Sequence, residues 1–276
     1  MPELPEVEVI CRGIRPYLIN RTVRDIYHSG KQLRHTIPID EMNQKLLKHK
    51  VVAVERRAKY LMIRFDNSAL LLFHFGMTGN LGIFAPDTPI AKHDHLRMLL
   101  DNNTELRLND TRRFGSIDLI ADCTKENLED TFFATTGPEP FSDDFSGKAL
   151  KKMASKKSLP VKTYIMTNLV VAGVGNIYAN ESLFAAGIRP SRRVNQISLQ
   201  SWNRLAGEIR RVLAHAIDCG GSTISDFVNA SQETGYFQMN FKVYGKEGEK
   251  CTLCSSLIKK QVIGGRATFF CPTCQR

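Results

Sequence analysis

The spacing of apolar residues divides the chain into two parts with different predicted secondary structure. In the first part, short runs rich in β-branched and aromatic residues predict strands. These predicted strands cover residues 22–28, 51–55, 59–65, 70–75, 95–100, 105–109 and 116–120. A helical stretch over residues 40–48 separates the first two strands, and Asp66-Asn67-Ser68 joins 59–65 to 70–75 in the clearest hairpin. Many short strands of this kind predict a β-sandwich or barrel with flanking helices.

The second part begins after Gly137-Pro138-Glu139-Pro140, a sequence that neither a helix nor a central strand tolerates. Apolar residues from Trp202 to Ala216 form one stripe at helical spacing, and Gly220-Gly221 ends that helix. The predicted helices cover residues 146–154, 161–168, 177–186 and 198–218. The pattern therefore predicts an α+β protein in which a β-sandwich precedes a helical domain.

The length of 276 residues allows two domains, each with a substantial core. We expect an N-terminal β-sandwich domain over residues 1–136 and a linker over 137–150. A helical domain is expected over 151–240, followed by a cysteine-rich module over 241–276.

The charge balance favours a polyanionic partner. Thirty-eight Lys and Arg against 28 Asp and Glu leave a net charge of +10 and a pI near 9.3. Residues 241–276 carry seven basic and two acidic side chains, which is half of the net charge. Ribosome association, or solubility alone, would explain the same excess. Because the sequence shows no secretory h-region and no apolar run long enough to span a bilayer, we expect a cytosolic protein without a membrane partner.

Four of the seven cysteines follow a metal-binding pattern, in two C-x2-C pairs separated by 16 residues. This spacing is typical of a four-thiolate structural zinc site with a hairpin between the pairs, whereas redox activity or free thiols are the alternatives. The four are Cys251, Cys254, Cys271 and Cys274. The other three, expected to be buried structural thiols, are Cys11, Cys123 and Cys219. Since protein sulfur fills all four positions, the predicted zinc folds the hairpin and takes no part in chemistry.

The tip of that hairpin carries a candidate phosphate ligand. Gly264 and Gly265 precede Arg266, so the backbone can come close to a ligand that the guanidinium grips. A solvated surface arginine is the alternative.

The first residues of the chain combine a nucleophile with a carboxylate. Methionine before proline is readily trimmed, so the mature chain is expected to begin with the secondary amine of Pro2. An α-amino group has a pKa of about 8, so an appreciable fraction is unprotonated at neutral pH. After condensation with a sugar C1′, this amine gives an iminium that keeps its charge and acts as an electron sink. Glu3 is the nearest candidate for proton transfer, although a frayed terminus would explain both residues.

A helix is predicted behind this terminus. Pro5 suits its first position, and Glu6 and Glu8 suit the positive end of the helix dipole. Apolar residues recur at helical spacing from Val7 to Leu18. In this interpretation the two glutamates only stabilise the helix.

Other short segments suggest contacts with nucleic acid. Gly173-Val174-Gly175-Asn176 precedes a predicted helix and forms either a phosphate site or an ordinary tight turn. Residues 56–60 and 110–115 place arginines beside aromatic side chains, which can wedge into a base stack. Residues 75–79 form a third such turn, although base rates put Met77 and Phe114 in a core.

The histidines at positions 74, 93 and 95 do not complete a metal ligand set, because no carboxylate or cysteine joins them at a suitable spacing. We expect them to be hydrogen-bonded structural residues.

Taken together, these motifs resemble those of the bacterial formamidopyrimidine-DNA glycosylase family, which removes 8-oxoguanine and ring-opened purines from DNA. The resemblance covers essentially the full length. It rests on Pro2-Glu3-Leu4-Pro5-Glu6-Val7-Glu8, Arg57-Ala58-Lys59-Tyr60, Lys92-His93-Asp94-His95, Asp110 to Gly115, Gly137-Pro138-Glu139-Pro140, Gly173 to Glu181 and the cysteine pairs ending at Cys274. It implies a helix-two-turns-helix DNA-binding domain after the β-sandwich, and a monomer that acts on damaged double-stranded DNA in the nucleoid.

The resemblance also implies residue roles. Pro2 would attack C1′ and Glu3 would move protons, so that one nucleophile serves base removal and strand cleavage by β- and δ-elimination. The residues implied to contact DNA phosphates or the catalytic centre are Lys59, His93, Lys162, Asn176 and Arg266. Those implied to fill the gap left by a flipped nucleotide are Met77, Arg112 and Phe114. Glu6 would lie near the lesion pocket.

Two departures from the family pattern affect lesion preference more than chemistry. Val9 stands where threonine is common, and residues 230–239 correspond least clearly to the loop that closes over the flipped base.

Three other functions remain as alternatives. A glycosylase resembling endonuclease VIII would use the same nucleophile on oxidised pyrimidines, but Leu4 and the three gap-filling residues argue against it. A non-enzymatic zinc-ribbon protein that binds nucleic acid would have no special requirement at its N-terminus. Metal-dependent hydrolysis by the histidines would be inhibited by chelators that leave the zinc hairpin folded.

Overall fold

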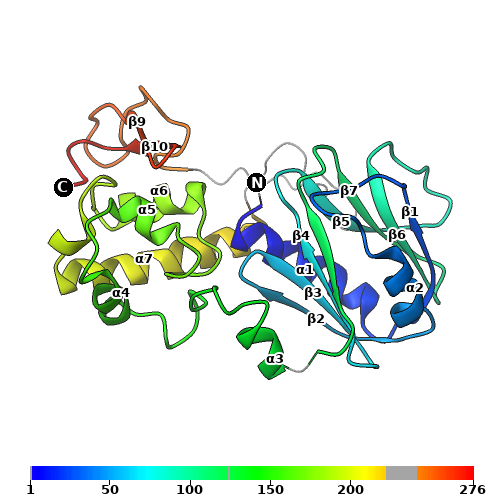
Figure 1. Ribbon diagram of the computed structural model, residues 1–276. Helices are drawn as coiled ribbons and strands as arrows, with labels where there is room; N and C mark the ends of the chain where they lie inside the picture. Colours follow the sequence, from blue (N-terminus) through cyan, green and yellow to red (C-terminus); the bar gives the residue numbers. More distant parts are fainter. Residues whose placement is uncertain (1, 124, 222–240) are drawn as a thin grey trace. The chain divides into compact units, whose positions relative to one another are not determined.

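The computed structural model describes residues 2–123, 125–221 and 241–276 (Figure 1). The described residues form two compact units, one of residues 2–134 with 220–221 and the other of residues 135–219 with 241–276. The second unit includes residues 241–276, and it also contains the segment 137–150 that the sequence suggested as a linker. No helix within the described ranges is long and apolar enough to cross a membrane.

Two antiparallel sheets form the first unit, as far as its residues are described. One sheet has the strand order β1-β6-β7-β5 and the other β2-β3-β4-β8. The strands of the first sheet are β1 (Val23–His28), β6 (Asp94–Leu100), β7 (Glu105–Asp110) and β5 (Gly79–Phe84). Those of the second are β2 (Val51–Arg57), β3 (Tyr60–Phe65), β4 (Leu70–His74) and β8 (Ser116–Ile120). The predicted hairpin of β3 and β4 is confirmed, with Ile63 opposite Leu71.

The core of this unit lies between the two sheets, which confirms the predicted sandwich. Alternate residues of β3, such as Leu61 and Ile63, face the same buried cluster as Met98 and Leu106 of the other sheet. Met62 of β3 points to the opposite face and joins a second, smaller cluster. Hydrophobic alternation with a period of two therefore determines which face of each strand is buried.

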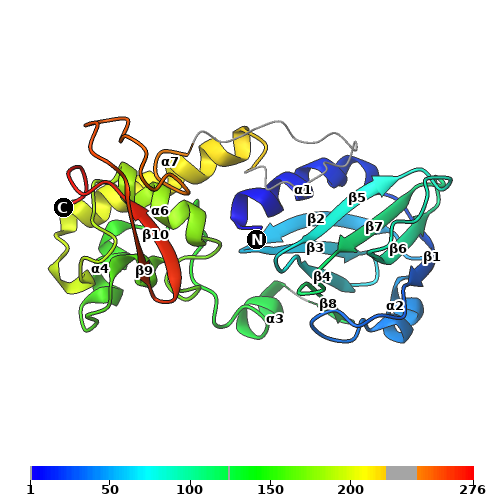
Figure 2. The ribbon, with the colours of Figure 1, turned by 90° about the horizontal axis from the view of Figure 1, so that it is seen from above.

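Two helices cover the sandwich. Helix α1 (Leu4–Leu18) contacts β2 and β5, which are edge strands of different sheets, so it closes one side of the sandwich (Figure 2). Its apolar residues Val7, Ile10 and Ile14 belong to the main core. Helix α2 (Ile39–Leu46) packs against β1. Burial of an apolar helical stripe, rather than helix propensity, stabilises helices of this length.

The predicted element boundaries differ from the structure in a few places. Strand β5 was not predicted, because Gly79 and Gly82 interrupt its alternation. Helix α3 (Lys125–Asp130) was not predicted either. The helix expected over 161–168 is shorter, since α5 ends at Ile165.

The second unit is mainly helical, with α4 (Gly147–Ala154), α5 (Val161–Ile165), α6 (Asn176–Ala185), the 3-10 helix η1 (Val194–Gln196) and α7 (Leu199–Asp218). The stripe predicted in α7 is buried, from Trp202 to Ala216. Residues Ile177 to Phe184 of α6 are all buried, because α7 packs on this helix and strand β10 (Arg266–Phe270) also contacts it. Strand β9 (Lys259–Ile263) pairs with β10 in the predicted hairpin.

Polar side chains buried in α6 hold the cysteine-rich module against the helices. The Glu181 carboxylate accepts hydrogen bonds from the backbone N–H groups of Lys242, Val243 and Tyr244, at 2.8 to 3.0 Å. Asn180 accepts one from the Phe269 N–H at 2.8 Å. Since each group is removed from water, its partner in the other element is required for stability.

We expect Glu181→Gln to destabilise the protein by about 1–3 kcal/mol, because an amide NH2 replaces an acceptor that faces backbone N–H groups. Glu208→Gln is the matched control, since Glu208 pairs with the exposed Arg211 and its loss should cost little. Urea unfolding of both variants measures the difference, and equal stabilities would contradict the role assigned to Glu181.

Candidate active site and nucleic-acid interface

The amino terminus is held by a capping box. Glu3 is the N-cap of α1, its side chain accepts from the N–H of Glu6, and the Glu6 carboxylate accepts from the N–H of Glu3 at 2.8 Å. Both glutamates are buried, with exposures of 2% and 4%. Helix α1 therefore begins at Leu4, one residue before the predicted Pro5. A frayed terminus does not fit this geometry, because both the side chain and the backbone N–H of Glu3, the residue next to Pro2, are hydrogen-bonded to Glu6.

A second carboxylate of α1 links this helix to the β2–β3 turn. Glu8 accepts from Arg56 Nε at 2.9 Å and from Arg12 Nε at 2.8 Å. Burial opposes ionisation of Glu8, but the hydrogen bonds from the two arginines outweigh it and lower the pKa of the carboxyl. Arg56 also donates to the carbonyl of Ala58 at 3.1 Å. One guanidinium thus ties the helix that carries Pro2 to the turn that carries Lys59.

Lys59 lies in that turn, not at the start of a strand as predicted. Arg57 pairs with Tyr60, so Ala58 and Lys59 form a two-residue connection. Ala58 has a φ of +54°, in the left-handed region that a two-residue hairpin requires. The side chain of Lys59 is half-buried rather than extended along a sheet.

His74 lies opposite Tyr60 in the β3–β4 ladder, with ring centroids 5.0 Å apart. Burial lowers the pKa of its imidazole to about 4, and the charges of Arg34 and Lys59 act in the same direction. The neutral ring accepts the N–H of Gly76 at 3.2 Å. His74 is therefore a structural residue beside Lys59, as expected, and sequence reasoning missed the contribution of Arg34.

The gap-filling residues implied by the family resemblance are on the surface. Met77 is 39% exposed and Phe114 is 45% exposed, in contrast to the core positions that base rates suggest. The Arg112 guanidinium lies over the Phe114 ring, 4.7 Å from its centroid. Exposed apolar side chains beside an arginine are suited to insertion into a base stack.

The neighbouring histidines have structural contacts. His95 is buried, and its Nε2 is 3.0 Å from the Asp110 carbonyl. The carbonyl of His93 accepts the N–H of Asp110 at 3.0 Å, and its ring is partly exposed. In the described ranges, neither histidine belongs to a group of three or more potential metal ligands.

Asn176 is the first residue of α6, and Gly175 is its N-cap. The helix begins one residue earlier than predicted, so Asn176 is inside the helix and does not cap it. Its carbonyl accepts from Asn180 Nδ2 at 2.6 Å. The contact of Asn176 with a phosphate stays a prediction.

Lys162 differs from its predicted role. Its side chain is completely buried, and Nζ donates to the Ala267 carbonyl at 2.8 Å and to Thr268 Oγ1 at 2.7 Å. An ammonium enclosed in this way has no exposed surface to offer a phosphate. The structure therefore assigns Lys162 to holding strand β10 in place.

Arg266 is exposed at the tip of the hairpin, where it pairs with Ile263. The two intervening residues, Gly264 and Gly265, have φ values of +57° and +71°. Positive φ at both positions defines the type I′ turn that suits a two-residue hairpin, which explains the glycine pair. The tip lies against α5, since a Cβ on Gly264 would be 3.1 Å from Thr163 Oγ1.

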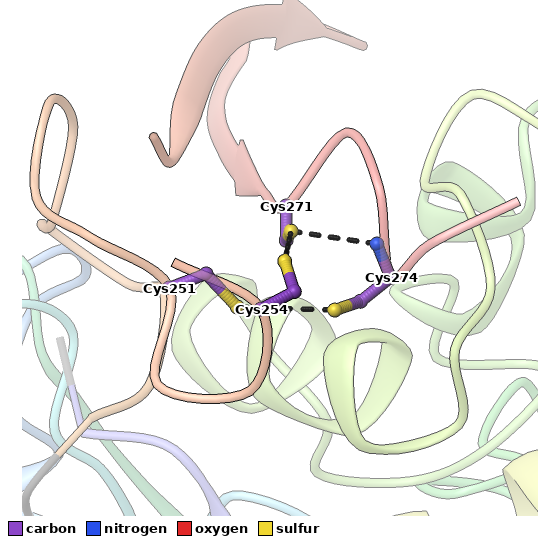
Figure 3. A group of neighbouring side chains, drawn as sticks. All are labelled: Cys251, Cys254, Cys271 and Cys274. Carbon is purple, nitrogen blue, oxygen red and sulfur yellow. Dashed lines mark hydrogen bonds between the residues drawn. The ribbon is translucent and has the colours of Figure 1, made fainter. Parts of the chain in front are cut away.

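The four predicted ligand cysteines converge at the base of this hairpin (Figure 3). Their Sγ atoms all lie within 4.8 Å of one another, with 3.9 Å between Cys251 and Cys274 and 3.4 Å between Cys254 and Cys271. These distances exclude disulfides and are close to the S–S separation of about 3.8 Å expected around tetrahedral zinc. The residues therefore fit one structural zinc ion.

The loop expected over the flipped base, residues 230–239, lies outside the described residues.

A sandwich with an anchored amino terminus, a helical unit and a hairpin with a four-thiolate metal site define the class of a multi-module zinc-finger protein. Models of known families match each of these parts. They match a formamidopyrimidine-DNA glycosylase N-terminal domain over residues 1–117, a formamidopyrimidine-DNA glycosylase H2TH domain over 136–228, and a zinc finger found in FPG and IleRS over 248–276.

Relatives and solved structures agree with these matches. Formamidopyrimidine-DNA glycosylases of Hahella chejuensis and Alcanivorax borkumensis are each 45% identical to the chain over 276 residues, covering 100% of both sequences. Lactococcus lactis Fpg in complex with abasic-site DNA superposes with a TM-score of 0.90 at 33% identity, covering 99% of each chain. The chain therefore belongs to the formamidopyrimidine-DNA glycosylase family. The family, the fold class and the zinc module expected from the sequence are confirmed.

We expect acid to destabilise the protein through His74. The unfolded chain binds a proton below pH 6.5, whereas folded His74 does so only below about pH 4, so stability is full above 6.5 and falls as the pH decreases toward 4. Urea unfolding across this range should show a shallower slope for His74→Gln than for the wild type. The same substitution at the exposed His35 is the control, and equal slopes for all three proteins would contradict the assignment.

We expect one zinc ion per chain, and its loss to weaken DNA binding because the hairpin that presents Arg266 would unfold. Cys254→Ser should lower the zinc content, while Cys219→Ser, outside the cluster, should keep one ion. Elemental analysis and fluorescence anisotropy with duplex DNA measure the two quantities. Retention of one zinc by Cys254→Ser would contradict the four-thiolate site.

Proposed function

We propose that this chain is a base-excision-repair DNA glycosylase that removes oxidised purines from duplex DNA and then cleaves the strand as a lyase. The observation that carries the proposal is the capping box, which fixes Glu3 beside Pro2 in a chain that matches its family relatives over their whole length. A nucleophile and a proton-transfer group in adjacent residues are what glycosylase and lyase chemistry need.

In the proposed mechanism, the nitrogen of Pro2 forms a bond to C1′ while the bond between C1′ and the damaged base breaks. The base leaves with the bonding electrons and takes up a proton. Opening of the sugar ring then leaves a protein–DNA iminium, and Glu3 protonates the released O4′. Because the iminium withdraws electrons, C2′ loses a proton and the 3′ phosphate is expelled, and a second elimination expels the 5′ phosphate.

The remaining exposed residues are proposed to bind and distort the DNA. Lys59, Asn176 and Arg266 would contact phosphates, and the partly exposed His93 would contact DNA near the sandwich. Met77, Arg112 and Phe114 would fill the space left when the damaged nucleotide turns out of the duplex. The net charge of +10 supports binding through counterion release.

Oxidised pyrimidines are a second candidate substrate class. A structure titled as wild-type Lactococcus lactis FPG with DNA containing an oxidised pyrimidine has a TM-score of 0.89 to this chain at 33% identity. The non-enzymatic zinc-ribbon alternative has less support, because the relatives match the whole chain and not only the zinc module. We further propose that the protein acts as a monomer in the bacterial cytosol.

The purified protein, with Met1 removed, should form a covalent adduct with an 8-oxoguanine duplex in the presence of sodium borohydride, which reduces the iminium. One extra residue ahead of Pro2 turns the amine into an amide and should abolish the adduct, whereas the same residue added at the C-terminus should not. An adduct with the N-terminally extended protein would show that an amine other than that of Pro2 is the nucleophile. An oxidised-pyrimidine duplex in parallel compares the two substrate classes, and the absence of an adduct with both duplexes would contradict the enzyme function.

A further inference from the structure

The two turns that carry Met77, Arg112 and Phe114 run side by side between the sheets. The first, residues 75–78, leads from β4 to β5, and the second, residues 111–115, leads from β7 to β8. Strand β4 pairs with β8, and β5 pairs with β7, so both turns cross the same edge of the sandwich. The pairing of Gly79 with Asp110 places the end of one turn against the start of the other.

A single buried carboxylate connects these turns. Asp110 is fully buried, its Oδ2 accepts from the N–H of Gly115 at 2.8 Å, and its Oδ1 accepts from the hydroxyl of Thr78. The Thr78 oxygen in turn accepts from the N–H of Arg112 at 3.0 Å. Asp110 and Thr78 thus bond to both ends of the second turn and to the first turn at once.

The backbones of the turns are also in direct contact. Gly76 has a φ of +60°, and a Cβ at this position would lie 2.4 Å from the carbonyl carbon and oxygen of Phe114. A Cβ on Gly115 would lie 2.9 Å from the His74 carbonyl. With no room for a side chain between them, neither turn can shift without moving the other.

We propose that Asp110 and Thr78 are positioning residues that join the two turns into one rigid wedge, so that Met77, Arg112 and Phe114 enter the duplex together. This inference rests on the proposed glycosylase function. It adds to that function the groups that hold the wedge together, since Asp110 is fully buried and the Thr78 hydroxyl is already bonded to Asp110 and to the N–H of Arg112. If the two turns moved independently, they would have to become ordered each time the protein bound DNA. The loss of conformational entropy would then weaken the insertion of the wedge into the duplex.

Thr78 offers a matched pair of variants. Thr78→Val keeps the shape of the side chain but removes both the bond to Asp110 and the acceptor for Arg112, whereas Thr78→Ser keeps both. We expect Thr78→Val to lower kcat/KM on an 8-oxoguanine duplex by about tenfold. Thr78→Ser should stay close to the wild type.

The second substrate separates positioning from general damage to the fold. An abasic site in single-stranded DNA needs no wedge, so the rate of borohydride trapping on it should change less than about threefold for either variant. Asp110→Asn, which replaces one of the two acceptor oxygens with an NH2 donor, should repeat the selective loss on the duplex. Thermal unfolding of all variants, followed by circular dichroism, is measured beside the rates to compare the stability of the folds.

Equal losses on both substrates, or equal rates for Thr78→Val and Thr78→Ser on the duplex, would overturn the proposal. Absence of trapping by the wild-type protein on the single-stranded abasic site would instead overturn the proposed function. The proposal is supported only if Thr78→Val lowers kcat/KM on the duplex and not the trapping rate on the single strand, and if Thr78→Ser retains the activity on the duplex.

Discussion

The proposed nucleophile, Pro2, lies at the end of the chain and can act only if that end is held in place, whereas chain termini ordinarily fray. Here the first turn of α1 supplies the restraint, because Glu3 and Glu6 satisfy each other's backbone N–H groups and are both buried. The helix behind them is itself fixed by its apolar stripe and by the link from Glu8 to Arg56. The packing of α1 on the sandwich therefore restrains the position of Pro2.

The residues of the sandwich that are proposed to contact DNA lie in short turns rather than on its strands. Two-residue and four- to five-residue connections carry Lys59, Met77 and Phe114, while the strands beside them supply the packing. This division suits recognition of a distorted duplex, because a turn exposes side chains that a sheet would bury. The tight turns require a positive φ at Ala58, which is a strained conformation for a residue with a side chain. They also require a close backbone contact at Gly76.

The zinc module depends on two kinds of interaction. The four cysteines are arranged to bind a metal that would close its base, while Lys162, Asn180 and Glu181 hold it to the helices through buried hydrogen bonds. Together they determine where the tip with Arg266 lies within this unit. The side chain of Lys162 is therefore bonded inside the protein, although the family resemblance implied a contact with phosphate.

The sequence by itself determined the sandwich, the helical unit, the cysteine cluster and the family, because periodic burial, turn residues and ligand spacing are local properties of a chain. It did not reveal β5, whose glycines interrupt the alternation of apolar residues and are required by close packing, such as the 2.5 Å approach of a Gly79 Cβ to the Phe75 carbonyl. Only the tertiary structure decided that Lys162 is buried, that Met77 and Phe114 are exposed, and that Asp110 joins their turns. Burial and hydrogen-bond partners of single polar residues depend on segments distant in the chain, which no local pattern encodes.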